Sequence, residues 1–287
     1  MSTTTSSDVE KPAAETLVGN LTAASSPSKE KEAERSEALR AFSSSFVDSE
    51  EMVAELVSNL ADLPTTPPSL YVDIEGVFLS RHGSVSIIQL LVLPKRHIYL
   101  IDILKLQHKA FTTADVKGQT LKLILESASI PKVFFDVRND SDALYSHYQI
   151  NLAGIQDIQL LEIASRGYNR RHIFGLSKCI DKDLPLTSDE KQTWKDVKEV
   201  GVKLFAPERG GSFEVFNVRP LSKKIEAYCV QDVQFMPKLW DHYTLRMGKV
   251  SPTWVKKVEV ATVARVRESQ QPGFNGKGQH MALAPRW

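Results

Sequence analysis

Three short β-prone segments follow one another between residues 69 and 103, and they constrain the fold more than any other feature of the chain. The apolar run at 69–74 is followed by 85–93 and 97–103, and a turn of Pro94, Lys95 and Arg96 separates the last two. Strands joined by such short connections pair in antiparallel fashion. We therefore expect an antiparallel three-stranded unit here.

After this unit the pattern alternates between helix and strand. A helix is expected ahead of the strands, with Asp48 as its N-cap and Glu51 three residues later. Further helices are expected near 118–127, 140–148, 156–166, 175–180 and 222–242, with short strands at 132–135 and 154–155. This order predicts an α/β fold in which helices flank a mixed central sheet.

Composition divides the chain into three parts. Residues 1–45 are rich in Ser, Thr, Ala, Glu and Lys, which predicts a disordered N-terminal tail. Residues 46–247 are expected to form one folded domain, in which the polar stretch 182–219, with its prolines and a Gly-Gly pair, is a loop insertion over one face. Residues 248–287 are basic and poor in core residues, so we expect a largely disordered C-terminal extension.

The bulk properties exclude several classes of protein. The formal net charge is +1, which argues against a purely electrostatic nucleic-acid binder. Two cysteines, Cys179 and Cys229, make neither a disulfide framework nor a four-cysteine zinc site. We find no secretory signal pattern, and the longest apolar stretch is too short to span a bilayer. We expect a soluble intracellular protein of the nucleus or cytoplasm, with no membrane partner.

The first candidate site is Asp73-Ile74-Glu75, at the end of a buried strand. Residues two apart on a strand point to the same face, so the two carboxylates lie side by side. Such a pair makes a site for Mg²⁺ or Mn²⁺. On its own, however, this common pattern is better explained as a solvated strand end.

The second candidate is Asp140, where a buried strand gives way to a polar loop and a helix. A carboxylate near a helix N-terminus is favoured by the helix dipole, so capping alone would explain it. Asp136 and Asp142 are competing candidates in the same segment.

Tyr228 and Asp232 form the third candidate site, four residues apart on one face of a strong helix. The same helix carries an apolar stripe, and a carboxylate near such a stripe is costly unless it is paired or binds a metal. Tyr228 is also consistent with a core aromatic whose hydroxyl is satisfied.

Taken together, these motifs resemble the DEDDy 3′→5′ exonucleases, the group of ribonuclease D, the Werner syndrome exonuclease domain and the proofreading domains of some DNA polymerases. The likeness covers most of residues 53–246, with Egalitarian-like eukaryotic members similar in the second motif. The segments that carry it are YVDIEG, VSIIQLLV, KVFFDVRNDSDALY, GIQDIQLLEIA and RPLSKKIEAYCVQDVQFMPKLW. Residues 181–218 depart from ribonuclease D in being longer and more charged, so substrate choice does not carry over.

The resemblance implies a ribonuclease-H-like fold for residues 46–247 and a set of roles. Asp73, Glu75, Asp140 and Asp232 would bind two divalent metal ions, Mg²⁺ or Mn²⁺, and Tyr228 would orient the attacking water. The implied activity is a two-metal-ion hydrolysis of phosphodiester bonds from the 3′ end of a nucleic acid, RNA or DNA, that releases nucleoside 5′-monophosphates.

The alternative interpretation is an exonuclease-like nucleic-acid-binding or adaptor module without catalysis. Such relatives lose one or more of the metal carboxylates, whereas all four acids and the tyrosine are present here. Carboxylates clustered without a metal would repel one another. The active nuclease is therefore favoured, with single-stranded or 3′-ended nucleic acid, RNA or DNA, as its partner. A third possibility is that the two tails dock protein partners, although their composition suits a passive role equally well.

Overall fold

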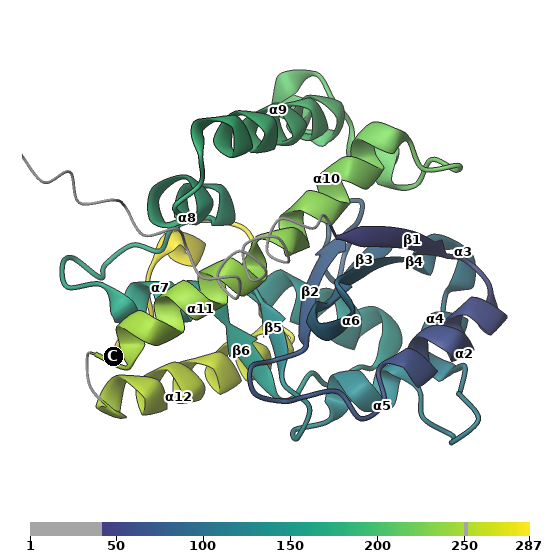
Figure 1. The fold of residues 1–287 in the computed structure, drawn as a ribbon, viewed down its shortest axis with the longest axis horizontal. Helices are drawn as coiled ribbons and strands as arrows, with labels where there is room; N and C mark the ends of the chain where they lie inside the picture. Colours follow the sequence, from purple (N-terminus) through teal and green to yellow (C-terminus); the bar gives the residue numbers. More distant parts are fainter. Residues whose placement is uncertain (1–41, 250–251) are drawn as a thin grey trace, which may run out of the picture. The chain divides into compact units, whose positions relative to one another are not determined.

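The computed structural model describes residues 42–249 and 252–287, and a six-stranded sheet forms the centre of the fold (Figure 1). The strand order is β1-β4-β3-β2-β5-β6. Strands β2, β3 and β4 pair in antiparallel fashion, as predicted, while β1, β5 and β6 join through parallel pairings. The strands are β1 (Ser43–Val47), β2 (Leu70–Glu75), β3 (Ile87–Val92), β4 (His97–Asp102), β5 (Lys132–Phe134) and β6 (Ile155–Asp157).

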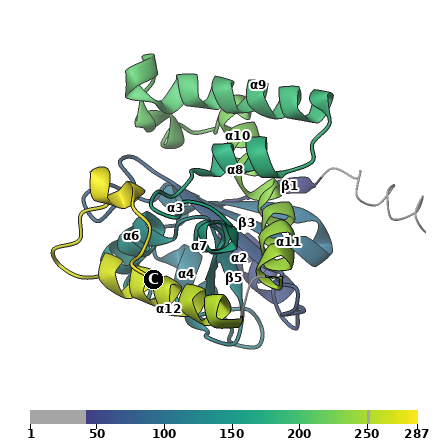
Figure 2. The same cartoon turned by 90° about the vertical axis from the view of Figure 1, so that its left-hand side faces the viewer.

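Helices cover both faces of this sheet, which confirms the α/β prediction (Figures 1 and 2). One core packs against α2 (Glu50–Asn59), α3 (Ile103–Leu106), α4 (Lys109–Thr112), α5 (Leu121–Glu126) and α6 (Arg138–Tyr148). The core on the other face involves α7 (Ile158–Ser165), α8 (Leu176–Asp183), α9 (Ser188–Phe205), α10 (Lys223–Gln234) and α11 (Met236–Met247). The short 3₁₀ segments are η1 (Leu93–Lys95), η2 (Pro207–Arg209), η3 (Phe213–Phe216) and η4 (Gln279–Ala282).

Strand β2 carries Asp73 and Glu75 in the part that extends past the end of its parallel neighbour, β5. Leu70, Val72 and Ile74 belong to the core under α2–α6, so the alternate residues face α10. Strand β5 pairs with β2 only at Leu70 and Tyr71. The last residues of β2 therefore project past the end of β5, where the chain turns into α6.

The first described residues correct two expectations. Ser43–Val47 forms strand β1, paired with β4, so the part of the predicted disordered tail from residue 43 onward is ordered, while residues 1–41 lie outside the described residues. The N-cap of α2 is Ser49, whose hydroxyl accepts from the Met52 amide, and not Asp48. Asp48 instead pairs with Lys105, 2.8 Å away, on the surface.

The expectation of a loop at 182–219 is wrong, because helix α9 (Ser188–Phe205) occupies its centre. The helix starts at a capping box, in which the Thr187 side chain accepts from the Glu190 amide and Glu190 accepts from the amide of Thr187. No proline falls within it. Only Trp194 and Gly201 of this helix are buried, so most of its residues are polar and the sequence did not indicate a helix here.

The single helix expected at 222–242 is two helices, α10 and α11. Ser222 caps α10 as predicted, and Phe235 ends it. The break follows from Pro237 in the first turn of α11, because proline offers no amide hydrogen to continue the ladder and its ring would clash with the preceding turn.

From residue 252 onward the C-terminal extension is ordered, contrary to the prediction of a largely disordered segment at 248–287. Helix α12 (Pro252–Ser269) packs on α6, α7 and β6 (Figures 1 and 2). Its contact surface uses small and polar residues, among them Ala261, Thr262 and Arg265, which a search for large apolar residues does not detect. Within residues 42–249 and 252–287, no helix has the length and apolarity needed to cross a bilayer.

Candidate active site

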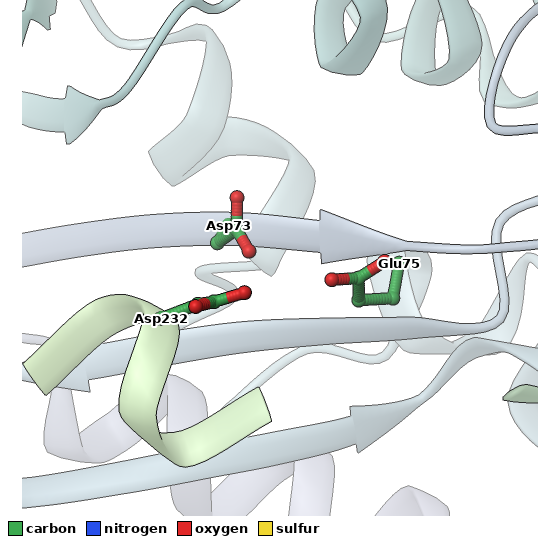
Figure 3. Close-up of side chains that lie close together, drawn as sticks. All are labelled: Asp73, Glu75 and Asp232. Atoms are coloured by element: carbon green, nitrogen blue, oxygen red, sulfur yellow. The ribbon is translucent and has the colours of Figure 1, made fainter. Parts of the chain in front are cut away.

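Three of the predicted acids converge at the end of β2. Asp73 and Glu75 come from the strand and Asp232 from α10, and their side chains point toward a common centre (Figure 3). One ligand atom from each lies within 4.8 Å of the others. Carboxylate oxygens at this spacing suit Mg²⁺ or Mn²⁺, so the residues present fit the metal that the motifs imply.

Helix α10 delivers two of the predicted residues to the sheet. The Ser222 hydroxyl caps it by accepting from the Ile225 amide, and the helix packs on β2, β3 and β4. Tyr228 and Asp232 share one face and are both buried, with 5% and 4% of their surfaces exposed. The i, i+4 spacing therefore places Tyr228 and Asp232 on one face of the helix, as predicted from the sequence.

Asp140 lies in the first turn of α6 and is buried. It lies outside the 4.8 Å group, but the charge of Asp73 is among the causes that raise its pKa, after burial. The two competing acids form ion pairs with arginines: Asp136 pairs with Arg138, and Asp142 pairs with Arg81. Among the described residues no ion pair involves Asp140, which leaves it as the acid of α6 with capacity for a metal.

The electrostatics of the cluster show a shortage of positive charge. Burial, followed by the neighbouring Asp232 carboxylate, raises the pKa of Asp73 to about 7. Burial and the charge of Asp73 hold the pKa of Glu75 well above its usual range. Carboxylates that resist ionisation in this way are stabilised in the charged form by a bound cation.

Sequence reasoning missed Lys198, a residue of the stretch assigned to a loop. Its Nζ lies 2.7 and 2.9 Å from the two carboxylate oxygens of Asp232 and 3.0 Å from the hydroxyl oxygen of Tyr228. The capping box at Thr187 and Glu190 was the signal that could have revealed the helix carrying it.

Asp157, in the segment GIQDIQLLEIA, organises the loop ahead of α6. Its carboxylate accepts from the amides of Asp136, Val137 and Gln159 at 3.0–3.2 Å, and it is fully buried. Asp157 thus holds the turn from which α6 and Asp140 begin.

Comparison with known proteins identifies the family to which this domain belongs. A 3′-5′ exonuclease family model matches residues 45–247. The chain belongs to the 3′-5′ exonuclease domain family. No curated protein matches its sequence.

Several solved structures share the fold of this domain. The RNase D of Trypanosoma brucei in complex with RNA U12 has a TM-score of 0.66 at 21% identity, covering 88% of this chain and 80% of that one. Escherichia coli RNase D, an exoribonuclease involved in structured RNA processing, has a TM-score of 0.56 at 17% identity, covering 79% of this chain and 50% of that one. Brucella melitensis NrnC with bound Mg²⁺ has a TM-score of 0.50 at 15% identity, covering 83% of this chain and 100% of that one. The resemblance to DEDDy exonucleases and the ribonuclease-H-like fold are thereby confirmed.

Proposed function

We propose that the chain is an active 3′→5′ exonuclease that hydrolyses phosphodiester bonds at the 3′ end of a single-stranded or 3′-ended nucleic acid and releases nucleoside 5′-monophosphates. The observation that carries the proposal is the convergence of Asp73, Glu75 and Asp232 within 4.8 Å, in a domain of the exonuclease family. A binding module has no need of carboxylates gathered at such cost to one another.

Four acids would hold the metal. Asp73, Glu75 and Asp232 would bind one divalent ion, and Asp73 and Asp140 would support a second. When bound, the two ions would stabilise the attacking and leaving oxygens of an in-line displacement. Asp140 and Asp232 are buried and Asp73 and Glu75 are partly buried, so these side chains are restricted between α10, β2 and α6 and little reorganisation is needed on binding.

Tyr228 would orient the attacking water. Its ring is buried against α9, and its hydroxyl accepts a hydrogen bond from Lys198, which also donates to Asp232. Burial and the charge of Asp232 raise the pKa of Tyr228 well above its usual range, so the phenol keeps its proton at neutral pH. A neutral phenol serves as a hydrogen-bond donor to water and not as a base.

The nucleic-acid substrate is supported by the solved relatives. One RNase D with the same fold has been solved in complex with RNA U12, and another is an exoribonuclease involved in structured RNA processing. Single-stranded RNA is therefore the first substrate to test, with DNA of the same sequence beside it.

The test is digestion of 5′-labelled single-stranded RNA and DNA with Mg²⁺ or Mn²⁺, comparing the parent with Asp73→Ala. We expect a ladder that shortens from the 3′ end, depends on the metal and disappears in Asp73→Ala. Glu208→Gln, which changes an exposed acid in η2, is the matched control and should cleave like the parent. A folded parent that cleaves neither substrate with either metal would contradict the proposal and favour the binding module.

A further inference from the structure

Helix α9 docks on α10 through a narrow stripe of its surface (Figures 1 and 2). Trp194, Lys198 and Gly201 are spaced by four and three residues, so they share one face. Trp194 and Gly201 are the buried residues of the helix, and the side chain of Lys198 is 20% exposed. At the end of the helix, Phe205 also packs against Tyr228, with the two ring centroids 5.1 Å apart.

Gly201 sets how closely α9 approaches the site. A Cβ atom at this position would lie 2.3 Å from Cδ2 of Tyr228 and 2.7 Å from its Cγ. Any side chain would therefore push the two helices apart. Glycine is less favourable than alanine inside a helix, and here its missing side chain allows the backbone of α9 to rest on the Tyr228 ring.

A hydrogen bond between the helices fixes the same stripe one turn earlier. Nε2 of Gln231 on α10 donates to the carbonyl oxygen of Trp194 at 3.0 Å, and the contact is buried. Gln231 precedes Asp232, so this bond and the Gly201 contact hold α9 on either side of Lys198. The position of the lysine is thus determined by packing at both ends.

The ammonium group of Lys198 connects the two functional side chains of α10. It donates to both oxygens of Asp232 and to the hydroxyl oxygen of Tyr228. A phenol oxygen that accepts from Lys198 has its own hydrogen left to donate. Within residues 42–249 and 252–287, Lys198 is the only cation that forms an ion pair with any of the four candidate metal ligands.

Lys198 is compatible with the arrangement of the acids around a metal. The ligand atoms of Asp73, Glu75 and Asp232 stay within 4.8 Å of one another while both oxygens of Asp232 contact the lysine. Each carboxylate oxygen has two lone pairs, so Asp232 retains acceptor capacity toward the centre of the site.

We propose that Lys198 is a positioning residue of the exonuclease site. Its ammonium group fixes the Tyr228 hydroxyl and the Asp232 carboxylate relative to each other, and the close packing of Gly201 on the Tyr228 ring sets its own position. This inference rests on the proposed function. It makes α9 a functional part of the active site, because the helix supplies the contact that directs the Tyr228 hydrogen.

Steady-state cleavage of 5′-labelled single-stranded RNA tests the role of the ammonium group. Lys198→Met removes the charge and keeps the length of the side chain, so kcat should fall roughly 10–100-fold while KM stays within about twofold. Lys198→Arg keeps donors near both partners and should recover part of kcat. Lys195→Met, on the exposed side of the same helix, is the control and should behave like the parent.

Calorimetric titration of the protein with Mn²⁺, without nucleic acid, gives a readout independent of activity. Lys198→Met should bind Mn²⁺ no more tightly than the parent, because the lysine orients Asp232 and does not block it. If Lys198→Met bound Mn²⁺ more tightly and kept the parental kcat, the lysine would be a competitor for the metal position, and the inference would be overturned.

A double-mutant cycle tests the part played by Gly201. Gly201→Ala should lower kcat as Lys198→Met does, and the double variant should show little further loss, because both changes break the same contact. Additive losses would overturn the link between the two residues. If the parent is active and Lys198→Met has the parental kcat, the inference about Lys198 is contradicted but the proposed function stands. If the parent itself is inactive, the proposed function is contradicted. Melting curves of each variant establish that it is folded.

Discussion

Arg265 of α12 donates from Nη1 to a carboxylate oxygen of Asp157, 2.7 Å away and 108 residues earlier in the chain. Both side chains are buried, with exposed fractions of 5% and 0%. Arg265 also lies 3.4 Å from Asp136. Helix α12 therefore neutralises Asp136, in the loop that precedes α6, and Asp157, the end of β6, which accepts hydrogen bonds from the amides of that loop.

Arg265→Met should destabilise the protein, because it leaves the buried charge of Asp157 without its cation. We expect the free energy of unfolding to fall by about 3 kcal/mol, measured by urea denaturation. Lys256→Met removes an exposed cation from the same helix and should change stability by less than about 0.5 kcal/mol. Equal effects of the two substitutions would show that the ion pair adds nothing to the fold.

Asp140 and Asp142 should separate activity from stability, although they are two residues apart on α6. Asp140→Asn should reduce cleavage by at least about 10²-fold with little loss of stability, because it removes a charge that is repelled by its neighbours. Asp142→Asn weakens the pair with Arg81 and should lower stability by about 2 kcal/mol while cleavage persists. The pair of variants is compared by cleavage rate and by urea midpoint. The reverse pattern would exchange the roles assigned to the two acids.

The stability of the metal-free protein should fall as the pH rises from about 4 to about 7. Over this range the pKa of Asp73, raised to about 7, keeps the folded state protonated, whereas an unfolded aspartate has already lost its proton. The folded state then binds more protons, so the free energy of unfolding decreases with increasing pH.

Urea midpoints at pH 5 and pH 7 for the parent and Asp73→Asn isolate this contribution. The decrease from pH 5 to pH 7 should be smaller in the variant. Stabilisation by Mn²⁺ should be greater at pH 8 than at pH 6, because the metal binds carboxylates that have released their protons. Identical pH slopes in the parent and variant would contradict the raised pKa of Asp73.

Tyr228→Phe should lower kcat roughly 10–100-fold with little change in KM, since it removes the hydroxyl and keeps the buried ring. Tyr243→Phe is the matched control. It removes a buried tyrosine hydroxyl in α11, which donates to Asp183 at 2.8 Å, and should leave cleavage unchanged. Loss of activity in both variants would indicate a packing effect and not a role for the Tyr228 hydroxyl.

Much of the sheet was predictable because its strands follow simple patterns. β2, β3 and β4 are short apolar runs with tight connections, and the structure places them within a few residues of the predicted bounds. Asp73, Glu75 and Asp232 were found through motif spacing, which strand and helix periodicity converts into shared faces. Their meeting point depended on the family resemblance, since Asp73 and Asp232 are far apart in the sequence.

The helices that the sequence did not reveal share a physical cause. α9 buries only Trp194 and Gly201, and the contact surface of α12 includes Thr262 and Arg265. Each helix also packs apolar residues, but a glycine or charged and polar side chains interrupt them, which weakens the apolar periodicity that signals a helix. Lys198 was missed because it lies in the stretch assigned to a loop and because its contact with Tyr228 exists only once two helices have packed.

The ion pair between Arg265 and Asp157 has a consequence for the order of events during translation. The ribosome makes the four acids of the site before it makes α12. Until Arg265 has emerged and folded back, a nascent chain carries an uncompensated charge on Asp157, which lies directly behind the loop that starts α6. Helix α12, which follows all four acids in the sequence, thus completes the frame of the candidate site, and a chain that stalls before this helix would hold those acids in an unfinished frame.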